Sequence, residues 1–376
     1  MTVHTLRDLA DAALCPLLVV KLGSSLLVDA AGRERADWLA GLLAELARQH
    51  RAGQRIVIVS SGAIALGAAR LGLPGRPRES LADSQAAASV GQVRLAGLYD
   101  RLLHAEGIVA AQMLVTLGDL ENRRSYLNAA ATLERLLAQG CVPVVNENDS
   151  VATEEIRFGD NDRLAARVAQ AAGADAVLLF SDVDGLYDRA PGEEGARLLT
   201  RIETIDDELR AAAGPSASRI GTGGMASKLA AAEIATRAGI SLAIGNGTVD
   251  RPFERIAAEG VGTLFIAQDG PMARKTWLGG RLSPGGTVSV DPGCASALRD
   301  GASLLAVGMT GVEGDFARGD LVRLVDESGQ AIAQGLVEYD AATCRALAGK
   351  RQGEQEALLG HAPRRAVVHR DHLVLL

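Results

Sequence analysis

The sequence predicts an α/β protein in which helices sandwich a mostly parallel open sheet, followed by a small β-rich domain. Two features of the 376-residue chain carry this prediction. Short apolar runs alternate with long amphipathic stretches through most of the chain, as in a parallel sheet covered by helices. After about Leu282 the pattern changes to short strand-like pieces separated by Gly and Asp. The length suits roughly two to three domains.

The strands expected in the first domain are continuous apolar runs such as LLVVKL, RIVIVS and AVLLFS. Strands buried on both faces have this pattern, whereas half-exposed strands alternate apolar and polar residues. We therefore expect helices on both faces of the sheet. The expected strands are Leu17–Leu22, Arg55–Ser60, Ile108–Val115, Cys141–Asn146, Ala176–Ser181 and Ile240–Ile244.

Amphipathic stretches between these runs predict the helices of the first domain. They are Ala36–Arg51, Ala63–Leu71, Asp83–Ala105, Asp119–Ala138, Asn161–Ala172 and Gly224–Ala238.

A Pro-Gly-Gly break at Ser283–Gly286 separates the second domain from the first. The expected strands that follow are TVSVD, LLAVG, LVRLVD, AIAQGLVEY and RAVVHR, with short helices near Ala295–Asp300 and Ala341–Leu347. We therefore predict domains at residues 1–282 and 286–376.

Composition excludes several classes of protein. Hydrophobic residues make up 48% and charged residues 23%, as in soluble globular proteins. The net charge of −7 gives no general electrostatic case for nucleic acid or an anionic membrane as partner. No apolar run approaches the roughly 18 residues of a membrane span, and the N-terminus lacks the features of a secretory signal. We expect a cytoplasmic protein.

Cysteine and histidine usage narrows the chemistry further. Cys15, Cys141, Cys294 and Cys344 are far apart and form no CxxC motif, which indicates neither a zinc site nor a disulfide framework. We expect four small buried hydrophobic residues. No histidine lies between residues 105 and 360. Chemistry within that stretch would use carboxylates, lysines, hydroxyls and backbone amides.

Small and polar residues collect where the predicted strands end, and ligands of open α/β sheets bind beyond the carboxyl ends of the strands. Taken singly, each segment has a structural explanation as a turn or a helix cap. GTGGMASK also lacks the Gly-Lys-Ser/Thr ending of a P-loop. Together they favour a ligand site. The segments are KLGSS (21–25), SSGA (60–63), NENDS (146–150), GDNDR (159–163), SDVDG (181–185) and GTGGMASK (221–228).

These residue types suit the binding of a phosphate-rich anion. Glycines let backbone N–H groups approach phosphate oxygens, and helix N-termini add positive dipole ends. Lys21 and Lys228 would supply two point charges, as phosphoryl transfer requires. Asp160 and Asp162 could position those lysines or hold Mg²⁺. Without a histidine no strong general base is available, which indicates an acceptor that needs no deprotonation, such as a carboxylate.

The motifs VVKLGSSLL, IVIVSSGAIALG, PVVNENDSVATEEIRFGDNDRLAA, LLFSDVDGLY and RIGTGGMASKLAAA resemble the glutamate 5-kinases of the amino-acid kinase superfamily. The C-terminal part resembles the PUA domain that follows many of them. The resemblance implies ATP-dependent phosphorylation of the γ-carboxylate of L-glutamate to L-glutamyl 5-phosphate, the first step of proline biosynthesis. It also implies ATP and Mg²⁺ as cofactors, proline as feedback inhibitor and a homo-oligomeric assembly.

The resemblance assigns roles residue by residue. It makes Lys21, Lys228 and Asp162 catalytic, with Asp162 organising the two lysines, and Asp160 a candidate Mg²⁺ ligand. The implied substrate residues are Ser61, Gly62, Ala63, Asn146, Asp149 and Asn161. The implied nucleotide residues are Lys21, Gly23, Ser181, Asp182, Thr222, Gly223, Gly224, Met225, Ala226, Ser227 and Lys228.

The sequence departs from the family pattern at three places. Ser60 and Ser181 stand where Thr is common, which keeps the hydroxyl, and Val183-Asp184 replaces Gln-Lys or a similar pair at the edge of the nucleotide site.

Two alternatives remain open at the level of sequence. One is a sibling kinase that acts on another carboxylate. The other is an RNA-binding protein whose first domain is vestigial, since PUA-like domains elsewhere bind structured RNA. Residues 286–376 hold 12 Asp/Glu and nine Lys/Arg, whereas an RNA-binding surface should be basic. The sequence therefore favours the kinase.

Overall fold

The computed structural model describes residues 3–29, 31–73, 80–151, 161–189, 193–212, 224–268, 284–364 and 366–376. The chain divides into two compact units, Met1–Leu120 with Ala129–Asp269 and Glu121–Asn128 with Gly270–Leu376. The predicted bounds 1–282 and 286–376 stay a prediction, because residues 269–283 lie outside the described part.

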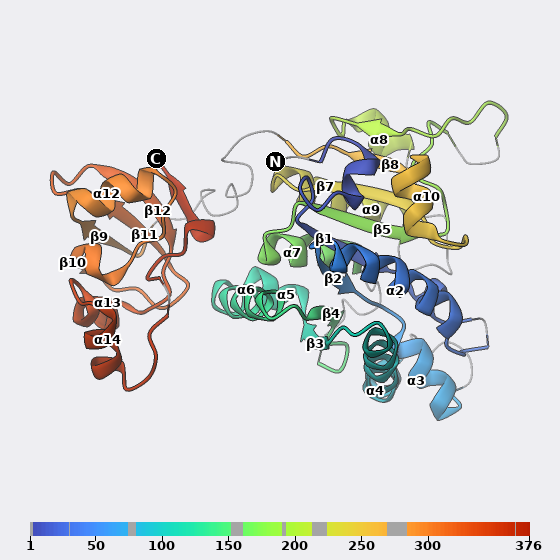
Figure 1. Ribbon diagram of the computed structural model, residues 1–376, viewed down its shortest axis with the longest axis horizontal. Coiled ribbons are helices and arrows are strands. Elements are labelled where there is room, and N and C mark those ends of the chain that lie inside the picture. The colour runs from blue at the N-terminus through green and yellow to red at the C-terminus, as the bar shows by residue number, and fades with distance from the viewer. Residues whose placement is uncertain are drawn as a thin grey trace. The chain divides into compact units, whose positions relative to one another are not determined.

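The first unit is built on an eight-stranded sheet of order β3-β4-β2-β1-β5-β7-β8-β6 (Figure 1). The pairs β3–β4, β4–β2, β2–β1, β1–β5 and β5–β7 are parallel, and β8 runs antiparallel to β7. The mostly parallel sheet is therefore confirmed. Its strands are β1 (Leu17–Leu22), β2 (Arg55–Val59), β3 (Ala110–Val115), β4 (Val142–Glu147), β5 (Ala176–Ser181), β6 (Arg201–Ile202), β7 (Ser241–Asn246) and β8 (Thr263–Phe265).

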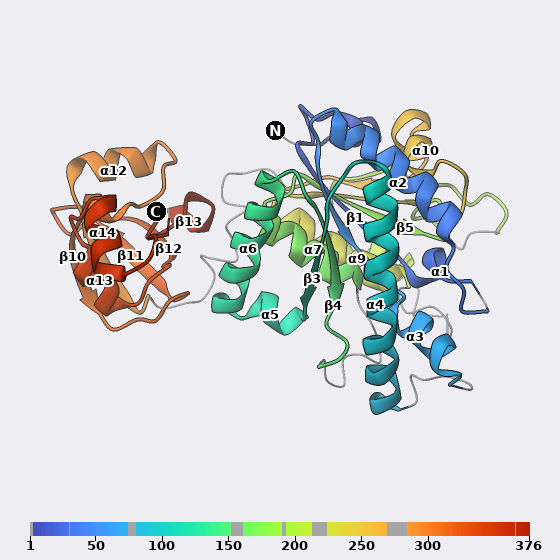
Figure 2. The same ribbon diagram turned by 60° about the horizontal axis from the view of Figure 1, so that its bottom comes forward.

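Helices cover both faces of this sheet (Figures 1 and 2). The principal helices agree with the predicted ones to within about two residues, except that one predicted helix is two. The helical segments are η1 (Leu6–Ala10), α1 (Ser24–Leu27), α2 (Ala36–Arg51), α3 (Ala63–Leu71), α4 (Leu81–Ala105), α5 (Leu117–Glu121), α6 (Arg123–Ala138), α7 (Asn161–Ala172), α8 (Asp207–Ala212), α9 (Met225–Arg237) and α10 (Pro252–Glu259).

Alternation along each strand sorts side chains between the two layers, because successive residues of a strand point to opposite faces. Leu18, Val20 and Leu22 of β1 join one apolar cluster with leucines of α2 and α4 and with Phe253 of α10. Lys21 therefore points to the opposite face, where α7 contacts β1 and packs against α9. This alternation places the polar residues at the strand ends.

The second unit contains a five-stranded sheet of order β10-β9-β11-β12-β13, mostly antiparallel. It has its own core, which includes Val288, Leu324 and Val368. The β-rich prediction is confirmed. The elements are β9 (Gly286–Val290), α12 (Pro292–Arg299), η5 (Ala306–Gly308), β10 (Met309–Gly314), β11 (Leu321–Val325), β12 (Ala331–Leu336), α13 (Ala341–Leu347), α14 (Gln352–Leu359), η6 (Arg370–His372) and β13 (Leu373–Leu375).

Three local predictions are wrong. The helix expected over Asp119–Ala138 is broken at Asn122, whose side-chain oxygen accepts the backbone N–H groups of Arg124 and Ser125. LLAVG forms η5 instead of a strand, with only an isolated bridge from Leu304. Within RAVVHR, Val368 forms the other side of that bridge, and the last strand begins at Leu373.

All four cysteines are free thiols, as expected. Cys15 and Cys344 are buried, and burial raises the pKa of each thiol to about 12. Cys141 and Cys294 are only half-buried, so the expectation of four buried cysteines holds for two of them.

Candidate active site

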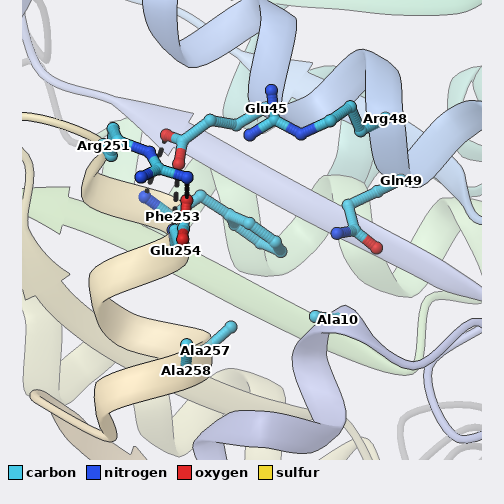
Figure 3. A pocket seen from close by; sticks show the side chains of 9 residues that line it. All are labelled: Ala10, Glu45, Arg48, Gln49, Arg251, Phe253, Glu254, Ala257 and Ala258. Atoms are coloured by element: carbon cyan, nitrogen blue, oxygen red, sulfur yellow. Dashed lines mark hydrogen bonds and ion pairs between the residues drawn. The ribbon is translucent and has the colours of Figure 1, made fainter.

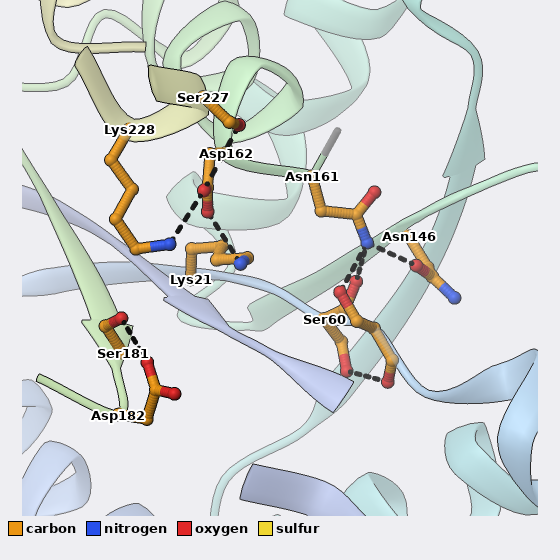
Figure 4. Close-up of polar contacts among 10 residues, drawn as sticks. Lys21, Ser60, Asn146, Asn161, Asp162, Ser181, Asp182, Ser227 and Lys228 are labelled. Atoms are coloured by element: carbon orange, nitrogen blue, oxygen red, sulfur yellow. Dashed lines mark hydrogen bonds and ion pairs between the residues drawn. The ribbon is translucent and has the colours of Figure 1, made fainter. Parts of the chain in front are cut away.

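Two lysines and one aspartate form a buried cluster at the carboxyl end of β1. The ammonium of Lys21 lies 2.6 Å from Oδ1 of Asp162, and that of Lys228 lies 3.1 Å from Oδ2 (Figure 4). Ser227 Oγ donates a longer hydrogen bond of 3.3 Å to Oδ2. The side chains of Lys21, Asp162 and Lys228 are at most 9% exposed. One carboxylate therefore holds two ammonium groups on either side of itself.

Three elements bring these groups together. Lys21 is the penultimate residue of β1 and points to the face covered by α7. Asp162 lies in the first turn of α7, where the helix dipole favours a negative charge. Lys228 follows the N-terminus of α9, whose N-cap residue is Gly224. The two helices pack against each other, which fixes the distance between Asp162 and Lys228.

The charges in this cluster support one another. Burial would raise the pKa of the Asp162 carboxyl, but the nearby ammonium groups of Lys21 and Lys228 outweigh burial and hold that pKa below its usual range. Asp162 is therefore ionised at neutral pH. The cluster carries one net positive charge at the place where strand ends and helix N-termini meet, an arrangement suited to a phosphate group.

A second cluster, built from neutral groups, starts at Asn161, the residue before Asp162. The Nδ2 of Asn161 donates to the carbonyl oxygen of Ser60 at 2.8 Å and to Ser61 Oγ at 2.6 Å. It also lies 3.4 Å from Asn146 Oδ1 (Figure 4). Asn161 Oδ1 is buried and accepts no hydrogen bond within the described part of the chain. Asn161, Ser61 and Asn146, three of the predicted substrate residues, are therefore in contact, and Asn161 Oδ1 remains as a buried hydrogen-bond acceptor.

Glycine shapes the loop next to this neutral cluster. Gly62 has a φ of +98°, a backbone conformation that L side chains rarely adopt, and it is the N-cap residue of α3. Ala63 begins that helix and is buried. Gly23 occupies the corresponding N-cap position of the short helix α1, directly after β1. Both glycines therefore lie where a strand ends and a helix begins.

The predicted nucleotide residues at the end of β5 form a pair. Ser181 Oγ donates to Asp182 Oδ1 at 3.1 Å, and Figure 4 shows this pair on the opposite side of Lys21 from Asn161. Asp184, one of the residues that depart from the family pattern, contacts Asn246 Nδ2 at 3.2 Å and Arg255 at 3.6 Å. Its carboxylate is thus engaged by β7 and α10.

Asp149 lies in the loop after β4 and is half-buried. It borders a cavity of about 310 Å³ together with residues of α4, β3 and the same loop. Gln92 and Glu147 also line this cavity, so it adjoins the neutral cluster. The full lining is Ala88, Ser89, Gln92, Val93, Gln112, Leu114, Glu147, Asn148, Asp149 and Ser150.

A separate cavity of about 350 Å³ lies between α2, α10 and η1 (Figure 3). Glu45, one of its polar lining residues, accepts the backbone N–H groups of Phe253 and Glu254 at 3.3 and 3.1 Å. Burial raises the pKa of the Glu45 carboxyl, although those two amides oppose the shift. Glu45 thus satisfies the N-terminus of α10, and the cavity contains no predicted site residue.

Three predicted residues, Asp160, Thr222 and Gly223, lie outside the described part of the chain. Among the described residues, no group of three His, Cys, Asp or Glu could hold a metal ion. Asp162 already faces two ammonium groups. Mg²⁺ commonly binds through substrate phosphates, water and only one or two carboxylates, so these residues are compatible with a metal that arrives with a nucleotide. The role of Asp160 stays a prediction.

Two residues of α4 join the site without having been predicted. Tyr99 OH lies 2.9 Å from Ser60 Oγ, and Gln92 Oε1 accepts a hydrogen bond of 2.7 Å from Asn146 Nδ2. The two residues are seven apart and so share a helix face.

Comparison with known proteins assigns the chain to a family. The model of the amino acid kinase family matches residues 16–246, and the model of the PUA domain matches residues 286–357. The chain belongs to the amino acid kinase family. This membership confirms the family resemblance and the kinase fold expected from the motifs.

Several curated relatives are similar over almost their whole length, and each carries the name glutamate 5-kinase. The protein from Sphingopyxis alaskensis is 58% identical, with 98% of this chain and 100% of the relative covered. That from Novosphingobium aromaticivorans is 55% identical with complete coverage of both. That from Zymomonas mobilis subsp. mobilis is 52% identical, with 96% and 92% covered. Similarity to kinases across both domains disfavours a vestigial first domain.

Whether a helix of this chain could span a membrane is judged from the structure. Within the part of the chain that the structure describes, no helix is both long enough and apolar enough to span a membrane.

Proposed function

We propose that the chain is a glutamate 5-kinase, which transfers the γ-phosphoryl group of ATP to the γ-carboxylate of L-glutamate. The observation that carries the proposal is the buried pair of ammonium groups held by Asp162 at the ends of β1, α7 and α9. The names of the relatives at 52–58% identity support the same substrate. The products are ADP and L-glutamyl 5-phosphate.

The chemistry follows from the charges in the cluster. A γ-carboxylate is ionised at neutral pH, so its oxygen attacks the γ-phosphorus of ATP without a general base. The bond to the β-phosphate oxygen breaks on the opposite side, and its electron pair leaves with ADP. The phosphoryl oxygens and the leaving oxygen carry negative charge in the transition state. Lys21 and Lys228, held by Asp162, neutralise that charge without reorganisation.

The neutral cluster suits the amino-acid end of the substrate. Asn161 Oδ1, a buried acceptor, would receive an N–H of the α-ammonium group, and Asp149 would supply its counter-charge. Ser61, Gly62 and Ala63 would bind the substrate through a hydroxyl and the N-terminus of α3. Hydrogen bonds to charged groups contribute about 1.5–3 kcal/mol each. Two such contacts are enough to distinguish an amino acid from a plain dicarboxylate.

The nucleotide would bind along Gly23, Ser181, Asp182 and the segment that ends at Lys228. Mg²⁺ bound to ATP would neutralise phosphate charge alongside the lysines, with Asp160 as its candidate protein ligand. The N-terminus of α9, at Gly224, Met225 and Ala226, would present backbone N–H groups and the positive end of the helix dipole to the phosphate oxygens.

Release of ADP, coupled to a spectroscopic readout, tests the proposal. Glutamate should stimulate ADP release strongly, and aspartate, N-acetylglutamate and glutarate should do so weakly. Stimulation by N-acetylglutamate above glutamate would assign the chain to a sibling kinase instead. Tight RNA binding at low salt without ADP release would favour the RNA-binding alternative.

The family resemblance also supports one proposal on inhibition and one on oligomeric state. Proline would inhibit by competing at the glutamate site, so raising glutamate should relieve the inhibition. The chain would form a homo-oligomer, which light scattering of the purified protein would measure. A cytoplasmic location is likewise expected from this role in amino-acid biosynthesis.

A further inference from the structure

Helix α4 contributes one side chain, Gln92, to the neutral cluster. Gln92 Oε1 accepts a hydrogen bond of 2.7 Å from Asn146 Nδ2, across 54 residues of sequence. Asn146 is only 2% exposed, so its amide has few other partners to choose from. Gln92 itself is half-buried and borders the cavity beside Asp149.

An unusually close helix crossing brings Gln92 to this position. A Cβ atom added to Gly91 would lie 1.8 Å from the carbonyl oxygen of Ala63, and one added to Gly67 would lie 1.7 Å from that of Ala87. Only glycine allows the backbones of α3 and α4 to approach this closely. Gln92 follows Gly91 directly, so the crossing fixes its backbone against the N-terminal part of α3.

The hydrogen bond to Gln92 determines which way the Asn146 amide faces. With Nδ2 donating to Gln92, Asn146 Oδ1 must face the other way, where it accepts from the backbone N–H of Glu147 at 2.9 Å. The same oxygen lies 3.4 Å from Asn161 Nδ2. If the Asn146 amide were flipped, its NH₂ group would face the backbone N–H of Glu147 and its Oδ1 would face Gln92 Oε1, so both hydrogen bonds would be lost.

Asn146 also contacts Asn161. Asn161 Nδ2 donates to the carbonyl oxygen of Ser60 at 2.8 Å and to Ser61 Oγ at 2.6 Å, which leaves its Oδ1 as the buried acceptor of the site. Asn146 Oδ1 adds a third, longer contact to the same Nδ2 at 3.4 Å. A chain of three amides therefore runs from Gln92 through Asn146 to Asn161.

We propose that Gln92 is a positioning residue for the amino group of the substrate, acting through Asn146 and Asn161. The inference rests on the proposed function, because it assigns the substrate's ammonium group to Asn161 Oδ1. Gln92 does not touch the reacting atoms. Its loss changes the affinity for the acceptor and leaves phosphoryl transfer intact.

Substitution of Gln92 by Met tests this role, since Met keeps the length of the side chain and removes the hydrogen-bond acceptor. Loss of one hydrogen bond that orients a buried amide should raise the KM for glutamate roughly tenfold. The kcat and the KM for ATP should stay at wild-type values. Gln92→Glu keeps an acceptor for Asn146 Nδ2 and should restore most of the affinity.

Gln54→Met is the matched control. Gln54 is buried, and its Nε2 donates to the carbonyl oxygens of Leu9 and Cys15, away from the site. It should lower thermal stability and leave the KM for glutamate unchanged. Glutarate, which lacks the amino group, provides a second readout, because Gln92→Met should reduce kcat/KM for glutamate and not for glutarate.

Four results would overturn the proposal: an unchanged KM for glutamate in Gln92→Met, an equal rise in Gln54→Met, no recovery in Gln92→Glu, or an equal loss for glutarate. Each requires that the wild-type enzyme releases ADP in response to glutamate. A wild-type enzyme without that activity would contradict the proposed function itself, so the two failures are distinguishable.

Discussion

Two adjacent residues at the start of α7, Asn161 and Asp162, lie in opposite kinds of environment. Asp162 faces two ammonium groups, whereas the partners of Asn161 among the described residues are a carbonyl, a hydroxyl and an amide. Side chains at the ends of the strands are divided between the two faces of the sheet in the same way. Lys21 shares a face with Leu17 and Val19, toward α7, whereas Ser60 and Asn146 bond to Tyr99 and Gln92 of α4 on the other side of the sheet.

The contrast shows how the fold assigns tasks. Under the proposed function, the charged groups would lie where the transferred phosphoryl group develops charge, with one buried carboxylate holding the two ammonium groups in place. The neutral hydrogen-bonding groups would lie where the amino acid is recognised by shape and by donor and acceptor pattern. Changes in the charged half should therefore act on turnover and folding, and changes in the neutral half on affinity.

The largest effect should come from Asp162→Asn. This variant leaves the buried ammonium groups of Lys21 and Lys228 without a counter-charge, and breaking a buried ion pair in this way costs about 3–5 kcal/mol. Urea unfolding should show a drop of that size in the free energy of unfolding, together with loss of turnover. A drop below about 1 kcal/mol, the value of an exposed pair, would show that the three charges are not coupled.

Lowering the pH of the wild-type protein should remove part of the stability that Asp162→Asn removes, because acid protonates the same carboxylate. The pKa of Asp162 lies below its ordinary value of 3.8 in the folded protein, so its contribution to stability is complete above that value and is lost as the pH falls through the lower folded pKa. The difference in unfolding free energy between wild type and Asp162→Asn should be constant from pH 7 to pH 5 and should narrow below pH 3.8. Narrowing already at pH 5 would contradict a lowered pKa.

Lys228→Ala should reduce turnover by about 10²–10³, because its charge matters most as the phosphoryl group transfers. The affinity for glutamate should change far less, since Asn161 and its partners are untouched. Steady-state kinetics with both substrates varied measures the two effects separately, and Lys350→Ala in the second unit is the control. Near-normal turnover of the purified variant would remove Lys228 from the mechanism.

Asp149→Asn should act on the binding of the amino acid and not on turnover. Neutralising this carboxylate removes a charge-assisted hydrogen bond to the substrate's ammonium group, worth roughly 1.5–3 kcal/mol. The KM for glutamate should rise while the KM for ATP stays constant, and Asp100→Asn, on the exposed side of α4, is the control. An equal loss of affinity for both substrates would mean that the loop after β4 had lost its structure.

The charged half was easier to predict from sequence than the neutral half. Strands β1 and β5 have their predicted bounds, because runs buried on both faces are uninterrupted in the sequence. Lys21 and Lys228 are recognisable because they stand beside glycines at a strand end and at a helix start. Asn161 and Asn146 were assigned only through the family motif, since a single Asn beside a helix or strand is ordinarily a cap or a turn.

Gln92 and Tyr99 were missed because their role depends on a helix crossing between residues far apart in sequence. Glycines 67 and 91 are unremarkable in the sequence, and only the structure shows that each must lack a Cβ atom. Strands β6 and β8 were missed for a different reason. They have two and three residues, too few to show a periodicity.

The smallest effect should come from truncation after residue 282. All members of both halves that the structure describes precede this point, and the second unit has a core of its own that contains none of them. The truncated protein should therefore fold and release ADP in response to glutamate with kinetic constants close to those of the full chain. Circular dichroism, thermal unfolding and the coupled assay would test this on the purified fragment.

A soluble, folded fragment with no response to glutamate would show that residues beyond Gly286 contribute directly to catalysis. The histidines from His361 to His372 would then be the first residues to substitute. Aggregation on expression would show instead that the second unit covers an apolar surface of the first, and the comparison of the two halves would then hold only for the full chain.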